Sequence, residues 1–176
     1  LFRTGVGQSQ AGKSAQDAMA LVPSPDLVIS TGFAGALTPN IRIGDLVVDL
    51  ARSDPKWAGL VENLATKNQI PCHGGSFFSS AKLLSTAQEK LAAGVETGAI
   101  AVEMESQAVF EVARERRIPF LSVRAVSDRA DQDLPALVKG MGPSGRINLK
   151  MLSGILLDPS QWADLTRLAW SSRKAE

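Results

Sequence analysis

"AIAVEMESQAVFEVARERRIPFLSVRAVSDRAD", residues 99–131, is the stretch that decides the fold class. An apolar run at residues 99–102 predicts a short buried strand, and residues 104–117 predict a helix that ends at Ile118-Pro119. Residues 120–126 predict a second buried strand, which runs into the polar segment SDRAD. Strands that alternate with helices in this way are typical of α/β proteins, in which helices cover both faces of a sheet.

The same alternation extends over the rest of the chain. Further strands are predicted at residues 1–6, 26–30 and 43–50, and further helices at residues 11–21 and 54–68. The segment TGFAGAL after Ser30 predicts a glycine-rich turn, and a helix is expected from the N-cap Ser80 through Ala93, with Gly94 as its stop. One or two amphipathic helices are predicted in the tail from about Asn148. We therefore expect a single three-layer αβα domain over residues 1–176, with a central mixed sheet.

The composition excludes several functional classes. The net charge is +1, which gives no general attraction to nucleic acid or to an anionic membrane. Cys72 is the only cysteine and His73 the only histidine, so an internal disulfide and a multi-histidine metal site are excluded. No metal or organic cofactor is expected. No apolar run is long enough to span a bilayer, and a reduced, cytoplasmic setting is expected.

Residues 4–15, TGVGQSQAGKSA, match the pattern G-x-x-x-x-G-K-[ST] of loops that bind nucleotide phosphates. This motif makes an ATP- or GTP-binding protein one alternative. The other interpretation places Lys13 and Ser14 on the surface of a helix. The second interpretation is favoured because nothing else in the sequence suggests a nucleoside triphosphatase.

Two segments rich in carboxylates follow apolar strands. Glu103 and Glu105 lie between a strand and a helix, where they either favour the helix start or bind a vicinal diol such as the ribose hydroxyl groups. Ser127 and Asp128 end the next strand, where they either cap a helix or place an acid that protonates a leaving group. Arg124 lies within an otherwise apolar strand and points either to solvent or into a site.

Together, the segments DLVISTGFAGALTPNIRIGDLVV (residues 26–48) and 99–131 resemble the nucleoside phosphorylase and nucleosidase superfamily, above all its methylthioadenosine/S-adenosylhomocysteine nucleosidase branch. The blocks V-E-M-E and S-D-x-A-D are specific in combination. The tail is similar to that of the hopanoid-associated phosphorylases, which are thought to remove adenine from adenosylhopane. The resemblance implies an enzyme that cleaves the N-glycosidic bond of a purine nucleoside, with that small molecule as its partner, and a homo-oligomer.

The resemblance also implies roles for single residues. Glu105 would bind the ribose hydroxyl groups, with Met104 packed on the sugar. Asp128, beside Ser127, would protonate the purine at N7 as the base departs, and it would have to carry a proton when it acts, which burial favours. Arg124 would help to place the nucleophile. The other candidates for substrate contact are Glu103, Phe33, Ala34, Gly35 and Phe78, the last as a wall of the base pocket with Phe77 as its alternative.

The chain departs from the family's pattern at the expected phosphate site. Phosphorolytic members carry an Arg and a Ser in the second glycine-rich turn, where this chain has Ser30 and Phe33. We therefore expect hydrolysis by water, with phosphorolysis as the alternative. Gly5 and Gly7 are candidates for binding an anion through backbone N–H groups. The chain is expected to lack the family's N-terminal strand and the acidic residue there that activates water. A catalytically inactive nucleoside-binding domain is a third possibility.

Overall fold

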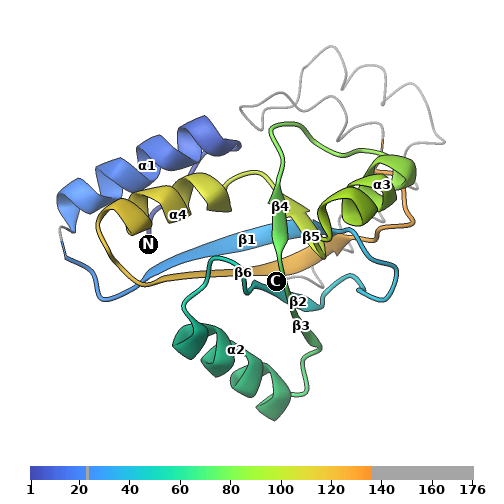
Figure 1. Cartoon of the computed structure of the whole chain (residues 1–176), viewed down its shortest axis with the longest axis horizontal. Coiled ribbons are helices and arrows are strands. Elements are labelled where there is room, and N and C mark those ends of the chain that lie inside the picture. Colours follow the sequence, from blue (N-terminus) through green and yellow to red (C-terminus); the bar gives the residue numbers. More distant parts are fainter. Residues whose placement is uncertain (23, 136–176) are drawn as a thin grey trace, which may run out of the picture.

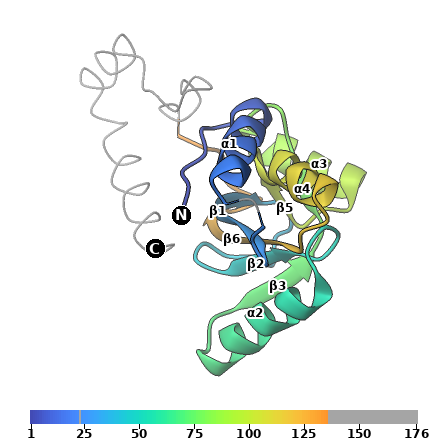
Figure 2. The same cartoon turned by 90° about the vertical axis from the view of Figure 1, so that its left-hand side faces the viewer.

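The fold is a six-stranded mixed sheet with helices on both faces (Figures 1 and 2). The computed structural model describes residues 1–22 and 24–135. Their helices are α1 (Gln8–Leu21), α2 (Pro55–Lys67), α3 (Ala87–Thr97) and α4 (Ser106–Glu115). Their strands are β1 (Val28–Ala36), β2 (Leu46–Asp49), β3 (Cys72–Gly75), β4 (Phe77–Ser79), β5 (Ala101–Glu103) and β6 (Phe120–Asp128). This architecture confirms the predicted three-layer αβα class and its central mixed sheet.

The two longest strands, β1 and β6, occupy the centre of the sheet, whose order is β3-β2-β6-β1-β5-β4. They are parallel, and their register runs from Val28 opposite Phe120 to Gly35 opposite Asp128. β2 and β5 are antiparallel to these neighbours, and the outer strands β3 and β4 are parallel to β2 and β5. Because parallel strands end at the same edge of a sheet, the last residues of β1 and β6 lie side by side.

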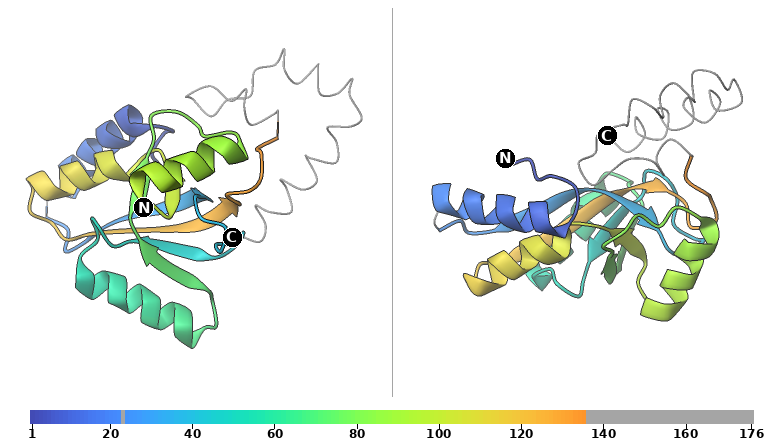
Figure 3. Two further views of the ribbon diagram at one scale, coloured as in Figure 1. Left: turned by 45° about the vertical axis from the view of Figure 1, so that its right-hand side comes forward. Right: turned by 90° about the horizontal axis from the view of Figure 1, so that it is seen from above.

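Small side chains allow α1 and α4 to pack together on one face of the sheet (Figures 1 and 3). The cluster between them and the sheet contains Ala11, Ala15, Met19, Val28, Val109, Val112, Ala113 and Phe120. On the other face, Ala58 of α2 packs with Val48 and Leu121 of the sheet. Ala11, Ala15 and Ala18 thus form the buried face of α1.

The segment TGFAGAL does not form the turn that its glycines predict. Residues 31–36 continue β1, and β1 pairs with β6 from Val28 to Gly35. Glycine weakens an isolated strand, but here β6 and β5 provide hydrogen-bonding partners on both edges of β1. A β-carbon at Gly35 would lie 2.9 Å from Asp128 Oδ2. The glycine is therefore needed for a close approach between strands and not for a turn.

The helix predicted to begin at Ser80 begins later. The Ser80 hydroxyl group instead forms hydrogen bonds with the backbone of Lys82 in the connection before α3. Thr86 is the N-cap of α3, and it forms a reciprocal capping box with Glu89. This box satisfies two backbone N–H groups at the helix start, which a serine without a matching glutamate does not do.

The same helix also ends later than predicted. It continues through Gly94 to Thr97 and ends at Gly98, whose φ of 68° lies in the left-handed region that favours glycine. A β-carbon at Gly94 would lie 2.6 Å from the carbonyl oxygen of Leu37. Gly94 is therefore a contact point inside the helix, and Gly98 is its stop.

Other differences involve segments with few apolar residues or without a strand partner. The prediction of a strand at residues 1–6 is wrong, and Leu1 and Phe2 are exposed. The sequence analysis missed β3 and β4, and His73 lies in β3 and not in a loop. These strands are short and contain glycine and polar residues, so they lack the apolar alternation that predicts a strand. The helices predicted from Asn148 lie outside the described residues.

Replacing Gly94 by alanine is expected to destabilise the protein by about 1–3 kcal/mol, because the new methyl group meets the backbone of Leu37. The matched control is Gly59→Ala in α2, where a β-carbon would meet nothing within 4 Å. That control is expected to stabilise by about 0.5–1 kcal/mol, since alanine favours helix more than glycine does. Urea denaturation followed by circular dichroism measures both changes. Equal effects of the two substitutions would contradict the close contact at Gly94.

Candidate active site

A pocket lies at the sheet edge where β1 and β6 end. Its walls come from β1, from the connection between β4 and α3, from β5 with the turn into α4, and from the end of β6 with the segment after it. The lining residues are Phe33, Ala34, Gly35, Lys82, Leu83, Leu84, Val102, Glu103, Met104, Glu105, Ser127, Asp128 and Leu134. The fold thus brings together most of the candidates for substrate contact, although they lie far apart in the sequence.

Glu105 is held by backbone N–H groups from two segments. Its Oε1 accepts a hydrogen bond from the Gly7 N–H at 2.9 Å, and its Oε2 accepts one from the Met104 N–H at 3.2 Å. Gly7 precedes α1 with a φ of 91°, which favours glycine. The turn of Gly5 and Gly7 therefore lies against the site, but the Gly7 N–H that was a candidate donor to an anion binds a carboxylate of the protein itself.

The motif GQSQAGKS, residues 7–14, does not form a phosphate-binding loop. α1 begins at Gln8, so Gly12, Lys13 and Ser14 lie inside the helix. In a phosphate-binding loop the glycine-rich backbone wraps around the phosphates, and its N–H groups point at them. The structure therefore contradicts the ATP- or GTP-binding alternative. It confirms that Lys13 and Ser14 lie on a helix, where Lys13 is exposed.

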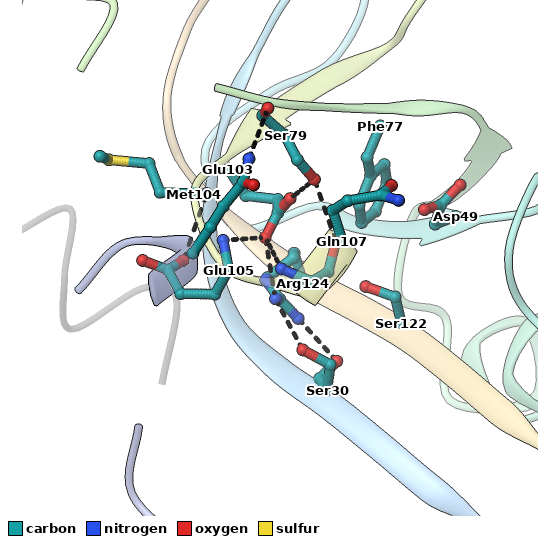
Figure 4. A network of polar contacts seen from close by, with 12 residues as sticks. Ser30, Asp49, Phe77, Ser79, Glu103, Met104, Glu105, Gln107, Ser122 and Arg124 are labelled. Carbon is teal, nitrogen blue, oxygen red and sulfur yellow. Dashed lines mark hydrogen bonds and ion pairs between the residues drawn. The ribbon is translucent and has the colours of Figure 1, made fainter. Parts of the chain in front are cut away.

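The carboxylate of Glu103 is the centre of a buried polar network (Figure 4). It accepts hydrogen bonds from the Ser79 hydroxyl group, from the Ser106 N–H at 2.6 Å and from the Glu105 N–H at 2.9 Å, and Arg124 Nη2 lies 3.2 Å away. Burial raises the pKa of Glu103, but the hydrogen bonds and the charge of Arg124 together hold that pKa below its ordinary value. Glu103 therefore anchors the turn that carries Glu105.

Arg124 points into the protein and not to solvent. Its side chain is 2% exposed, and its guanidinium group donates to the carbonyl oxygen of Ser30 at 2.6 Å and to the Ser30 hydroxyl group at 2.9 Å. Burial lowers the pKa of Arg124, and the nearby carboxylates of Glu103 and Glu105 offset part of that effect. Its observed partners are thus groups of the protein, and a direct contact with the nucleophile stays a prediction.

Arg52 follows β2 and extends the polar network to that strand. The sequence analysis missed this residue. Its guanidinium group donates to Asp49 at 2.5 Å, to the carbonyl oxygen of Phe77 at 2.6 Å and to the Ser79 hydroxyl group at 3.1 Å, and it also contacts Gln107. Asp49 is completely buried. An acidic residue at the end of the apolar run LVVD, with an arginine three residues later, is the sequence signal for this pair.

Asp128 lies between the pocket and a buried lysine. Its Oδ1 accepts a hydrogen bond from the Ser127 hydroxyl group at 2.8 Å, and its Oδ2 lies 2.7 Å from the ammonium group of Lys90. Lys90 is fully buried on α3. The sequence analysis missed this partner. Its signal is that Lys90 and Ala93 are three residues apart, so they share one helix face, and that face is the buried one.

Phe78 lies one layer behind the pocket wall. It packs against a cluster that contains Leu84 and Val102, which line the pocket, whereas Phe78 itself does not line it. Phe77 is buried in the core beneath the sheet. A contact between Phe78 and a purine base therefore stays a prediction.

The described residues contain no cluster of His, Cys, Asp or Glu side chains that could hold a metal ion. His73 lies in the edge strand β3, where its Nε2 is 2.9 Å from Asp45 Oδ2. Cys72 is a free thiol whose pKa is raised by burial and by the charge of Glu62. Within residues 1–22 and 24–135, no helix is both long and apolar enough to cross a membrane.

The chain is similar to known proteins in sequence and in fold. Residues 1–49 and 48–156 match the family described as the phosphorylase superfamily. The 5′-methylthioadenosine/S-adenosylhomocysteine nucleosidase of Haemophilus influenzae is 30% identical over 159 residues, which cover 74% of this chain and 68% of the relative.

Two solved structures share the fold. A Neisseria meningitidis nucleosidase of the same name, in complex with methylthio-immucillin-A, matches with a TM-score of 0.64 and 22% identity over 73% of this chain and 67% of its own. A Helicobacter pylori nucleosidase with butyl-thio-DADMe-Immucillin-A matches with a TM-score of 0.66 and 21% identity over 88% of this chain and 83% of its own.

Glu103→Gln is expected to remove a part of the stability that depends on pH. The pKa of Glu103 is lowered in the folded state, so its contribution is complete above the unfolded value of about 4.3 and is lost as the pH falls through the folded value. The substitution is expected to cost about 3–5 kcal/mol at neutral pH, because it leaves Arg124 buried without its counter-charge. Urea denaturation of both proteins in neutral and in acidic buffer measures the difference, which should shrink in acid.

The control for this experiment is Glu115→Gln, which changes an exposed carboxylate at the end of α4. It is expected to alter stability little at either pH. A difference between wild type and Glu103→Gln that grows in acid would contradict the lowered pKa of Glu103.

Proposed function

This chain belongs to the phosphorylase superfamily, and we propose that it hydrolyses the N-glycosidic bond of a purine nucleoside and releases the free base. The observation that carries this proposal is that two separately anchored carboxylates, Glu105 and Asp128, line one pocket. Cleavage of this bond builds positive charge on the sugar and negative charge on the base. An anion beside the sugar and a proton donor beside the base stabilise both ends of that transition state.

We assign Glu105 to the sugar. Each of its oxygens accepts one backbone hydrogen bond, from Gly7 and from Met104, and keeps a further lone pair for a substrate hydroxyl group. Glu103 supports the same turn from behind through the N–H of Glu105. Met104 lines the pocket next to Glu105 and is assigned to the face of the sugar. The carboxylate is thus oriented before the substrate binds, which lowers the cost of binding.

We assign Asp128 to the base. Ser127 fixes one of its oxygens, and the missing side chain of Gly35 makes room for the other. Phe33 and Ala34 line the pocket beside them. A carboxylic acid in this position supplies a proton to a nitrogen of the departing purine, which we take to be N7 from the family resemblance.

Water is the nucleophile that we propose. The Gly7 N–H, one of the two candidate anion donors, donates to Glu105, and the hydroxyl group of Ser30, at the expected phosphate site, accepts a hydrogen bond from Arg124. Both groups are thus already engaged within the protein. Phe33 offers no donor where a phosphorolytic relative is expected to have one. Phosphorolysis, including that of an adenosylhopane-type substrate, remains the alternative.

An adenine nucleoside is the proposed substrate, because the relatives at 30% identity are named for 5′-methylthioadenosine and S-adenosylhomocysteine. The pocket also contains the apolar side chains of Leu83, Leu84 and Leu134. Such a lining suits a purine ring or an apolar 5′ substituent.

We also propose that the enzyme acts in the cytoplasm as a homo-oligomer. The free thiol of Cys72 suits a reducing compartment. Ile29 and Phe33 of β1 and Leu60 and Leu64 of α2 are exposed, and a contact with a second copy would remove these apolar side chains from water. Light scattering tests the assembly, and a monomer at all concentrations would contradict it.

The reaction is tested by measuring base release from 5′-methylthioadenosine, S-adenosylhomocysteine, adenosine and inosine, with and without phosphate, on the full-length protein. Chromatography is expected to show free adenine whose formation does not depend on phosphate. A sugar 1-phosphate product would overturn the hydrolytic mechanism. Binding of adenine without turnover of any of the four nucleosides would favour the inactive nucleoside-binding domain.

Asp128→Asn is expected to lower kcat by about 10²–10⁴-fold, the range that general acid catalysis supplies, with little change in the affinity for adenine. Asp17→Asn, which changes an exposed carboxylate on α1, is the matched control and is expected to leave kcat unchanged. Turnover by the Asp128 variant at the wild-type rate would remove Asp128 from the mechanism.

A further inference from the structure

The contact between Lys90 and Asp128 joins a completely buried cation to the candidate acid. The Lys90 ammonium group lies 2.7 Å from Asp128 Oδ2 and also donates to the carbonyl oxygen of Arg129 at 2.5 Å. Lys90 has no exposed surface and does not line the pocket, whereas Asp128 does. Of the two groups that Lys90 contacts, Asp128 is the one that lines the pocket, so Lys90 acts on a substrate through a neighbour and not directly.

Burying an ammonium group is costly unless a partner compensates its charge. An apolar side chain would fill the same position between α3 and the end of β6 without that cost. The position is occupied by a group that holds a transferable proton, and the partner of that group is the carboxylate assigned to the leaving base. This coincidence suggests a role in the reaction.

Other charged groups near the pair do not replace Lys90. Arg129 and Asp131, in the segment after β6, are half exposed and pair with each other. Asp133 accepts a hydrogen bond from the Ala87 N–H at the start of α3, and Glu89 is used in the capping box of that helix.

On the pocket side, the titratable neighbours are Glu103 and Glu105 from β5 and its turn into α4, and Lys82 from the connection before α3. Both glutamates are engaged by other groups, whereas the Asp128 carboxylate accepts hydrogen bonds from Lys90 and Ser127. Among the described residues, Lys90 is thus the cation in direct contact with Asp128.

We propose that Lys90 is a positioning residue that holds the proton which Asp128 delivers to the leaving base, a role that rests on the proposed hydrolysis. The pair begins as an ammonium and a carboxylate. One proton moves from Lys90 Nζ to Asp128 Oδ2, and the carboxyl group then gives a proton to the purine nitrogen as the N-glycosidic bond breaks.

The electron pair of the broken bond goes to the base, which leaves neutral because it has gained that proton. Water bonds to the sugar carbon that the base has left and releases one proton to solvent. A neutral amine and a carboxylate remain in the pair, and they regain one proton through the Asp128 carboxylate, which lines the pocket, before the next turnover. A carboxyl group without such a partner is ionised at neutral pH and has no proton to give. The pair of Lys90 and Asp128 keeps one proton available, because solvent does not reach Lys90.

The test compares Lys90→Met, which removes the proton, with Lys90→Arg, which keeps the charge but does not release a proton. In Lys90→Met, kcat is expected to fall by about 100-fold or more near neutral pH. It should recover toward acidic pH, where Asp128 takes its proton from solvent. In Lys90→Arg, kcat is expected to stay low across the whole range, because the fixed cation keeps Asp128 ionised.

Lys67→Met changes an exposed lysine on α2 and is the control for loss of one positive charge. Circular dichroism and calorimetric binding of adenine verify that each variant is folded. A Lys90→Met variant that loses the same factor at every pH would overturn the proposal, since a purely structural role predicts that pattern. Near-normal turnover by Lys90→Arg would also overturn it, because charge alone would then suffice.

If Lys90→Met does not fold, the proposal is tested by the wild-type pH profile and by Lys90→Arg. The wild-type kcat is expected to stay level through neutral pH and to fall only in alkaline solution, whereas a fall between acidic and neutral pH would show that an isolated carboxylic acid is the donor. Failure of the proposed function is a separate result, because the wild-type protein would then release no base at any pH.

Discussion

The buried carboxylate of Glu103 is the constraint on which the rest of the site depends. A charge removed from water needs compensation by hydrogen bonds or by an opposite charge, and here Ser79, Ser106 and Arg124 provide it. Arg124 in turn contacts Ser30 of β1. One carboxylate thus links β4, β5, α4, β6 and β1 at the place where the pocket opens, so the polar interior and the sheet order support each other.

The two carboxylates assigned to the substrate have opposite surroundings. Glu105 is held by neutral backbone N–H groups, including that of Gly7, whereas Asp128 is held by a hydroxyl group and the cation of Lys90. In the first arrangement neutral donors orient the carboxylate, and in the second the proposed transferable proton lies next to a carboxylate. The difference matches a reaction that places positive charge on the sugar and negative charge on the base.

Residues 99–131 were sufficient to predict the α/β class, the strands on both sides of α4 and the carboxylates that meet in the pocket. The errors arose where local preference and the surrounding fold disagree. The glycines of TGFAGAL suggest a turn in isolation, but strands on both sides incorporate them into β1. Gly94 suggests a helix end, but it marks the contact with Leu37. Lys90 was missed because its partner Asp128 is distant in sequence. Arg52 has one local partner, Asp49, but its role in the network comes from contacts with residues far along the chain, such as Ser79.

The sequence by itself determined the α/β alternation around the longer apolar elements and the chemical groups available for catalysis, because hydrophobic periodicity and residue type are local properties. It did not determine the short strands β3 and β4, which lack that periodicity. Only the tertiary structure decided which of those groups meet. It brought Glu105 to Gly7, buried Arg124 against Glu103 and placed Lys90 behind Asp128. The physical reason is that a buried charge takes its partner from whichever strand or helix the packing brings within hydrogen-bonding distance, and sequence separation does not limit that choice.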